Sequence, residues 1–135
     1  MMKTVLVVED SPTTRKHIAL GLRSAGYRVV AAADGMEALE LLSQPENNAD
    51  LIVTDLNMPN LDGLGLIRAI RFTDRHLPIV ILSSAMDQVS RQNGLEAGAD
   101  RYLTKPFDSS LLLTEIGELL GETSLHQEAE VAVHA

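Results

Sequence analysis

The chain has 135 residues, of which 45% are hydrophobic and 3% aromatic, and its formal net charge is −8. This length fits one domain whose aliphatic core is large enough to fold without cross-links. The absence of cysteine excludes thiol catalysis, cysteine-ligated zinc and disulfides, and it is consistent with a cytoplasmic location. No stretch approaches the roughly 20 apolar residues of a membrane span, and the acidic balance argues against direct nucleic-acid binding.

Five short segments predict β-strands. Three are apolar at successive positions, as in a parallel sheet covered on both faces: Thr4–Val8, Leu51–Thr54 and Ile79–Ser83. Two are more mixed and are predicted as outer strands, Arg28–Ala32 and Arg101–Thr104.

Segments with helical spacing separate the strands, and Ser11 followed by Pro12 is a typical helix start. With their caps, the predicted helices run from Ser11 to Gly26, Gly35 to Ser43, about Leu64 to Arg71, Asp87 to Gly98, and Asp108 to Gly121. The side chains expected to face the core are, helix by helix, Ile18, Leu22 and Ala25; Met36, Leu39 and Leu42; Leu64, Ile67 and Ile70; Val89 and Leu95; and Leu112, Ile116 and Leu119.

Strands alternating with helices in this way predict a doubly wound α/β domain over residues 1–121. The polar, irregular segment 122–135 predicts a flexible tail or a linker stub. In open parallel sheets, ligands bind beyond the carboxyl ends of the strands. The residues at those ends are therefore the candidates for a functional site.

Charged and hydroxyl groups stand at the predicted strand ends. Glu9 and Asp10 follow the first strand, Asp55 follows the third, Ser83 ends the fourth, and Lys105 follows the fifth. Each alone is typical of a cap, a turn or the surface, but together they form a set suited to one reaction. Three carboxylates in one cleft repel one another unless a cation joins them, and oxygen ligands of this kind favour Mg²⁺.

Phosphoryl transfer to a carboxylate would use this set. Asp55 would be the nucleophile, and the protein would align the reactants and neutralise the phosphoryl oxygens. Mg²⁺ on the acidic pair would meet one oxygen, the Lys105 ammonium a second and the Ser83 hydroxyl a third, while the backbone carbonyl of Asn57 would add a metal ligand. Other chemistries lack their motifs: no Gly-rich loop follows the first strand, no G-x-S-x-G is present, and the histidines are scattered at positions 17, 76, 126 and 134.

In these residues the chain resembles response-regulator receiver domains, most closely the stand-alone chemotaxis type. The resemblance covers residues 3–120 and depends on four motifs: Val7–Ser11, Thr54–Gly63, Leu82–Ala85 and Lys105–Phe107. It implies a flavodoxin-like (βα)5 fold, with a five-stranded parallel sheet of order 2-1-3-4-5 and helices on both faces.

The resemblance also implies roles for single residues. These are a metal-binding pair at Glu9 and Asp10, a phosphoacceptor at Asp55, a metal-binding carbonyl at Asn57, switch residues at Ser83 and Tyr102, and a cis peptide between Lys105 and Pro106. The chain would then be a signalling switch rather than an enzyme. It would take phosphate, with Mg²⁺, from a sensor histidine kinase, a histidine phosphotransfer protein or a small phosphodonor. Its protein target would bind the face of the fourth helix, fifth strand and fifth helix.

Two positions depart from the family pattern, because Glu9–Asp10 replaces a common Asp–Asp pair and Ala85 is small and apolar. The latter is expected to leave the phosphate open to water or to a partner. Three other functions stay open: a phosphate shuttle or sink, a receiver fragment of a larger regulator, and an aspartyl-phosphate phosphatase. Asn57 argues against the phosphatase, which usually has a second acid at this position. If the natural chain ends at Ala135, residues 122–135 are too short for an output domain.

Overall fold

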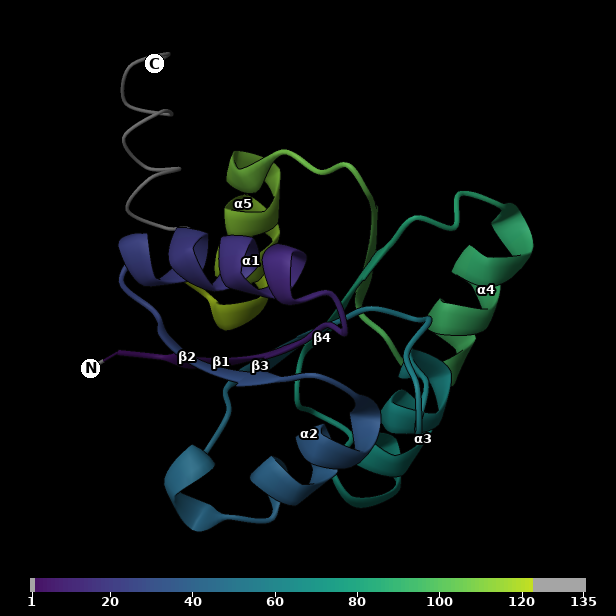
Figure 1. Ribbon diagram of the computed structural model, residues 1–135, viewed down its shortest axis with the longest axis horizontal. Helices are drawn as coiled ribbons and strands as arrows, with labels where there is room; N and C mark the ends of the chain where they lie inside the picture. The colour runs from purple at the N-terminus through teal and green to yellow at the C-terminus, as the bar shows by residue number, and fades with distance from the viewer. Residues whose placement is uncertain (1, 123–135) are drawn as a thin grey trace.

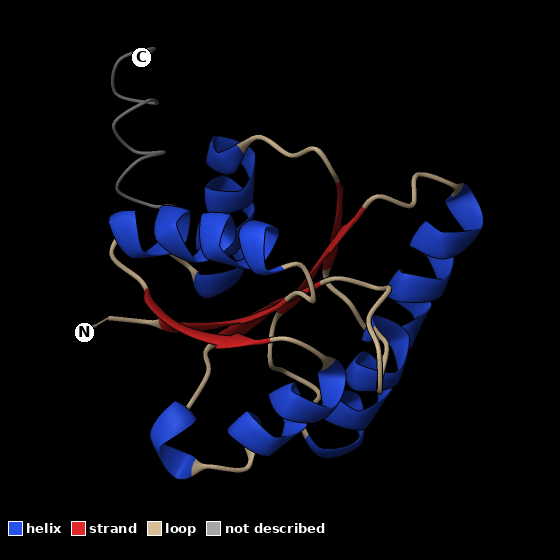
Figure 2. Ribbon diagram, viewed as in Figure 1, coloured by secondary structure: helices blue, strands red, loops and turns tan. Residues whose placement is uncertain are grey.

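The computed structural model describes residues 2–122, which form a parallel sheet covered by helices on both faces (Figures 1 and 2). The strands have the predicted bounds: β1 (Thr4–Val8), β2 (Arg28–Ala32), β3 (Leu51–Thr54), β4 (Ile79–Ser83) and β5 (Arg101–Thr104). Their order is β2-β1-β3-β4-β5, and every pairing is parallel. The flavodoxin-like fold and its strand order are therefore confirmed, with the two mixed strands at the edges.

Alternation along each strand divides the core into two layers. In β1, Val5 and Val7 pack on the layer formed with Ile18 and Leu22 of α1 and Leu112 and Ile116 of α5. The intervening Leu6 and Val8 pack on the other layer, with residues of α2, α3 and α4. Figure 1 shows the same division, with α1 and α5 on one face of the sheet and α2, α3 and α4 on the other. Successive strand side chains point to opposite faces, so a continuous apolar strand fills both layers.

The helices are α1 (Pro12–Ser24), α2 (Gly35–Leu42), α3 (Gly63–Thr73), α4 (Gln88–Ala97) and α5 (Ser109–Leu120), with a 3-10 turn, η1, at Pro45–Asn47. Each α-helix begins after a residue whose side chain accepts a hydrogen bond from a backbone N–H of the first turn: Ser11, Asp34, Asp62, Asp87 and Asp108. The third helix is longer than predicted, because Gly63 precedes the apolar stripe on which the prediction was based and Phe72 and Thr73 follow it.

Several predicted core positions are wrong. Ala25 is the exposed C-cap of α1, and Met36 is 54% exposed because α2 turns Gly35 and Ala38 inward. In α4, Val89 is 67% and Leu95 40% exposed. The remaining predicted core side chains of α1, α2, α3 and α5 are buried or partly buried.

Gly94 explains the error in α4, since it is the buried residue of that helix. A Cβ placed on Gly94 would lie 2.6 Å from Cδ1 of Ile81, so α4 approaches the sheet through bare backbone. A glycine contributes nothing to an apolar stripe, and spacing of large side chains therefore selects the wrong face.

The predicted tail, residues 122–135, lies outside the described residues except for Glu122, whose carboxylate accepts a 3.3 Å hydrogen bond from the Tyr27 hydroxyl. Among residues 2–122, no helix combines the length and the apolar character that crossing a membrane requires.

Candidate functional site

The strand register places the candidate residues side by side. Val8 of β1 is paired with Thr54 of β3, so the residues that follow them, Glu9 and Asp55, leave the sheet together. The ladder continues beyond the strands, with the Asp55 N–H donating to the Val8 carbonyl at 3.0 Å. In the same way the Lys105 N–H donates to the Ser83 carbonyl at 2.8 Å. The backbone beneath all these side chains is therefore fixed by sheet hydrogen bonds.

Three carboxylates converge at the carboxyl ends of the strands. Glu9, Asp10 and Asp55 each offer an oxygen, and these oxygens lie within 4.8 Å of one another. Glu9 and Asp55 are only 2% and 8% exposed, whereas Asp10 is exposed. Burial raises the pKa of Glu9 above its usual value, although hydrogen bonds from Lys105 and the Ser11 N–H act against this. A set of hard oxygen donors with one open side fits a Mg²⁺ ion, which retains several waters when bound.

Lys105 joins two of these acids. Its Nζ donates to Oε1 of Glu9 at 2.5 Å and to Oδ2 of Asp55 at 3.0 Å. Burial lowers the pKa of Lys105, but the hydrogen bonds and the attraction of both carboxylates outweigh burial and raise it above the usual value. The ammonium therefore stays charged at neutral pH. The peptide bond between Lys105 and Pro106 is cis.

One carboxylate oxygen of Asp55 is hydrogen-bonded to the adjacent backbone. Its Oδ1 accepts a 2.7 Å hydrogen bond from the Leu56 N–H, which leaves Oδ2 toward Lys105. Asn57, two residues further, lies exposed in the loop that follows β3.

Ser83 and Tyr102 both connect to Ala85. The Ser83 hydroxyl is completely buried and accepts from the Ala85 N–H at 3.1 Å. The Tyr102 ring is 4% exposed, and its hydroxyl donates to the Ala85 carbonyl at 2.6 Å. The two predicted switch residues are thus attached to the two sides of one short loop, between β4 and α4.

Gly63, the last residue of the Thr54–Gly63 motif, supports the backbone of the phosphoacceptor candidate Asp55. A Cβ on Gly63 would lie 2.2 Å from the Asp55 carbonyl oxygen and 2.7 Å from Cα of Leu56. The Gly63 N–H also donates to the Leu56 carbonyl at 2.8 Å. The start of α3 therefore rests directly on the backbone that carries Asp55. The position of this glycine in the loop motif was the only signal available.

Asn60 and Asp34 were missed altogether. Asn60 has a φ of 68°, a left-handed conformation that asparagine tolerates better than most residues. Its amide donates to the Asp34 carboxylate at 2.7 Å and so ties the loop after β3 to the start of α2. Contacts of this kind leave no pattern in the sequence, because the partners are 26 residues apart.

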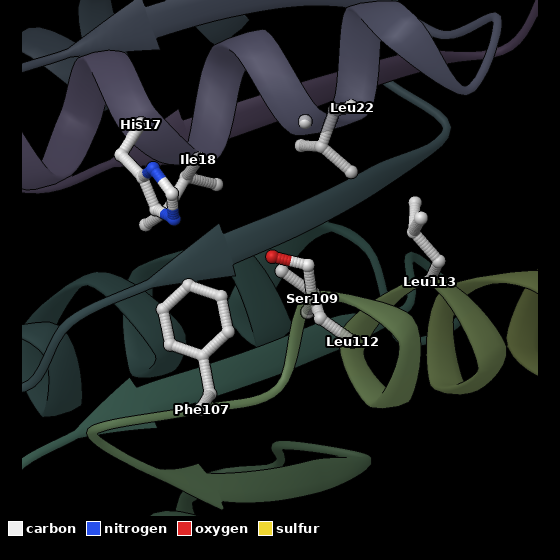
Figure 3. A pocket seen from close by; sticks show the side chains of 8 residues that line it. His17, Ile18, Leu22, Phe107, Ser109, Leu112 and Leu113 are labelled. Carbon is white, nitrogen blue, oxygen red and sulfur yellow. The ribbon is translucent and has the colours of Figure 1, made fainter.

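Two hollows lie between α1 and the segment after β5. The smaller, shown in Figure 3, is a gap of about 10 Å³, barely enough for one water molecule, and is a packing defect rather than a ligand site. In that view the His17 ring points toward Phe107, and the ring centroids are 6.4 Å apart. The larger is an open groove of about 370 Å³ beside the cleft, lined by Thr13, Thr14, His17, Lys105, Pro106 and Phe107. Lys105 is the residue that this groove shares with the acidic cleft.

Comparison with known proteins gives one family. Residues 5–117 match the response regulator receiver domain. The chain is 41% identical over 132 residues to the transcriptional regulatory protein PrrA of Mycobacterium tuberculosis, covering 96% of this chain and 56% of that protein. It is 46% identical over 121 residues to the response regulator MprA of Mycobacterium sp. strain KMS, covering 89% and 51%. The chain therefore spans about half the length of these curated relatives.

Solved structures agree with this result. The chemotaxis response regulator CheY4 of Vibrio cholerae superposes with a TM-score of 0.81 at 34% identity, covering 89% of this chain and 100% of that one. The receiver domain of the sensor histidine kinase PA1611 of Pseudomonas aeruginosa PAO1 gives a TM-score of 0.80 at 36% identity, covering 90% and 99%. That structure has a magnesium ion coordinated in its active-site cleft.

Proposed function

Because this chain belongs to the response regulator receiver domain family, we propose that it is a phosphorylation-controlled switch in which Asp55 accepts the phosphoryl group. The observation that carries the proposal is the contact of one lysine with two buried acids. The Lys105 ammonium lies 3.0 Å from Oδ2 of Asp55 and also holds Glu9. An ordinary surface lysine is solvated, whereas Lys105 is hydrogen-bonded to two buried carboxylates at the carboxyl ends of the strands.

The reaction forms a bond between an Asp55 oxygen and the donor's phosphorus. The donor's own bond to phosphorus breaks, and its electrons stay with the leaving group. Lys105 then exchanges its contact with the Asp55 carboxylate for one with a phosphoryl oxygen, which keeps that charge neutralised. Mg²⁺, held by Glu9, Asp10, Asp55 and the carbonyl of Asn57, would supply further positive charge opposite the phosphoryl oxygens.

Switching would begin at Ser83. Its hydroxyl now accepts from the Ala85 N–H, and donation of its own proton to a phosphoryl oxygen would draw it toward Asp55. Because Tyr102 is attached to the carbonyl of the same residue, a movement of Ala85 reaches the ring directly. The proposal therefore makes the loop from Ser83 to Asp87 the link between the phosphate and α4.

The phosphodonor is a sensor histidine kinase, a histidine phosphotransfer protein or a small phosphodonor. The open groove beside Lys105 gives such a protein an approach to Asp55 from the side of α1. The target binds the face of α4, β5 and α5, where Val89, Leu95 and Leu111 expose apolar surface. The proposal keeps the cytoplasmic location predicted from the sequence.

A second function, a receiver module of a transcriptional regulator, is favoured by identity to the curated relatives. Identity is 41% to PrrA and 46% to MprA, against 34% to the chemotaxis regulator CheY4. The stand-alone chemotaxis type stays the alternative, because CheY4 superposes with a TM-score of 0.81. Capture of partners by beryllofluoride-treated and untreated protein separates the two through the target, since a kinase is expected as donor in both. A motor component captured by the treated protein supports the chemotaxis type, and a DNA-binding output domain or promoter complex supports the other.

The phosphoacceptor is tested by substitution. The parent protein, given acetyl phosphate and Mg²⁺, is expected to gain one base-labile phosphoryl group by intact-mass spectrometry. Asp55→Asn is expected to gain none. The matched control is Asp100→Asn, which alters an acid at the amino end of β5, away from the carboxyl ends of the strands, and is expected to be labelled like the parent. Equal labelling of Asp55→Asn and the parent would show that the site assignment is wrong.

A further inference from the structure

The ring of Tyr102 is held in its buried orientation by three parts of the segment 85–94. Its hydroxyl donates to the Ala85 carbonyl at 2.6 Å. One edge faces the backbone of Gly94, where an added Cβ would lie 3.4 Å from Cδ2 of the ring. The guanidinium of Arg91 lies over the face of the ring, 5.6 Å from its centroid. Arg91 and Gly94 are one helical turn apart, so both contacts come from the same side of α4.

Among the described residues, no acid competes for Arg91. Within residues 2–122, its recorded polar contact is a 3.5 Å approach of Nη1 to the backbone carbonyl of Tyr102, and it takes part in no ion pair. Arg71 and Arg101, by contrast, are each paired with a carboxylate. Arg91 is thus committed to the ring and the main chain of Tyr102.

The contact of Arg91 with Tyr102 has a large influence on the position of α4, because this helix is weakly anchored to the sheet. Gly94 is the buried residue of this helix, and its larger apolar side chains, Val89 and Leu95, face solvent. The hold of α4 on the sheet therefore depends strongly on its contacts with Tyr102 and Ile81. A helix with few buried contacts is easily displaced, so each such contact has a large influence on its position.

We propose that Arg91 is a positioning residue that favours the inward orientation of Tyr102 and so couples α4 to the switch. The coupling to the switch rests on the proposed function, but the orientation of Tyr102 can be tested without it. A cation over an aromatic face attracts the ring only while the ring lies beneath it. An interaction present in one of two orientations shifts their equilibrium by its own free energy. For a cation at a partly exposed site, that shift is about two- to fivefold.

The aromatic composition of the chain makes the ring observable. The sequence has two tyrosines and no tryptophan, so Tyr27→Phe leaves Tyr102 as the sole tyrosine. In this background, quenching of tyrosine fluorescence by acrylamide reports how often the Tyr102 ring leaves its buried position. The measurement uses unphosphorylated protein, so it stands even if Asp55 is not the phosphoacceptor.

Three variants are compared in the Tyr27→Phe background. Arg91→Gln is expected to raise the quenching constant of Tyr102 by about two- to fivefold, because the outward population grows by that factor. Arg91→Lys keeps a cation near the ring and is expected to fall between Arg91→Gln and the parent. The charge-matched control is Arg68→Gln, an exposed arginine on α3, which is expected to leave quenching unchanged. Circular dichroism and urea unfolding establish that each variant is folded at the temperature used.

The proposal is overturned if Arg91→Gln is quenched no more than the parent. It is also overturned if Arg68→Gln raises quenching as much as Arg91→Gln does, since loss of charge alone would then explain the effect. A selective rise in the Arg91 variant supports it. Failure of Asp55→Asn to block phosphorylation would refute the proposed function while leaving this result unaffected.

Discussion

Substitution of Gly63 by alanine is expected to disturb both the fold and the phosphoacceptor. The added methyl would stand 2.2 Å from the Asp55 carbonyl oxygen and 2.7 Å from Cα of Leu56. Both are backbone atoms of the segment that leaves β3, so no side chain can rotate away to make room. Either the start of α3 or the backbone of Asp55 has to move.

The magnitude follows from this geometry. Overpacking in a well-packed interior costs roughly 1–3 kcal/mol, and a clash with backbone belongs at the upper end of that range. The gain in helix propensity from glycine to alanine is at most about 1 kcal/mol and does not offset it. A net loss of about 2 kcal/mol in the free energy of unfolding corresponds to a fall in Tm of about 8 °C for a domain of this size.

Gly21→Ala is the matched control, because nothing lies within 4 Å of the Cβ that it would add. Within α1 it is expected to raise stability by about 0.5–1 kcal/mol. The assays are thermal and urea unfolding followed by circular dichroism, together with the initial rate of labelling by acetyl phosphate. A displacement of Asp55 by about 1 Å lowers that rate by up to about 10²-fold. If Gly63→Ala matches the parent in Tm and labelling rate, the close approach of α3 to Asp55 is not real.

Three further outcomes are expected. The Tyr27 hydroxyl has its pKa raised from 10.0 to about 12, first by burial and then by Glu122, so its contribution to stability is present below pH 10 and is lost as the pH rises toward 12. In an alkaline absorbance titration, the tyrosinate signal that Tyr27→Phe removes should have its midpoint well above pH 10, and a midpoint at pH 10 would contradict this. Hydrogen bonds from Ser90 hold the pKa of Asp87 below 3.8, so its cap on α4 weakens as the pH falls through that lowered value. Asp87→Ala is expected to speed amide exchange in α4 more than Asp108→Ala does in α5, which buries Leu112 and Ile116, and equal effects would count against a weakly anchored α4. Lys105→Ala is expected to accept some phosphate but fail to switch, so phosphorylation should leave its partner affinity unchanged. A change in affinity on phosphorylation as large as the parent's would contradict the role of Lys105.

The strands were predictable because each carries its signal in consecutive residues. Strands buried on both faces are apolar throughout, and their ends are marked by the first charged or hydroxyl residue. The helices were less predictable in the face that they bury. Met36 and Val89 are large and apolar yet exposed, whereas Gly94 is buried. Spacing assumes that the largest apolar side chains face the core, and this fails where a helix approaches through glycine or alanine.

The candidate site was predictable to the extent that strand ends determine it. Because the fold rule brings the carboxyl ends of parallel strands to one edge, Glu9, Asp10, Asp55 and Lys105 could be placed together before any distance was known. Two contacts could not be predicted in this way: the hydrogen bond of Tyr102 to Ala85 and the position of Arg91 over the Tyr102 ring. Both depend on how closely α4 approaches the sheet.

By itself, then, the sequence determined the strands, their alternation with helices and the residues that reach the reactive edge, because these follow from local pattern and from one topological rule. The tertiary structure decided which oxygen of Asp55 faces Lys105, how tightly Gly63 confines that aspartate, and what holds Tyr102 inward. These are contacts between residues far apart in the chain, and they depend on distances of a few ångströms that no local pattern encodes.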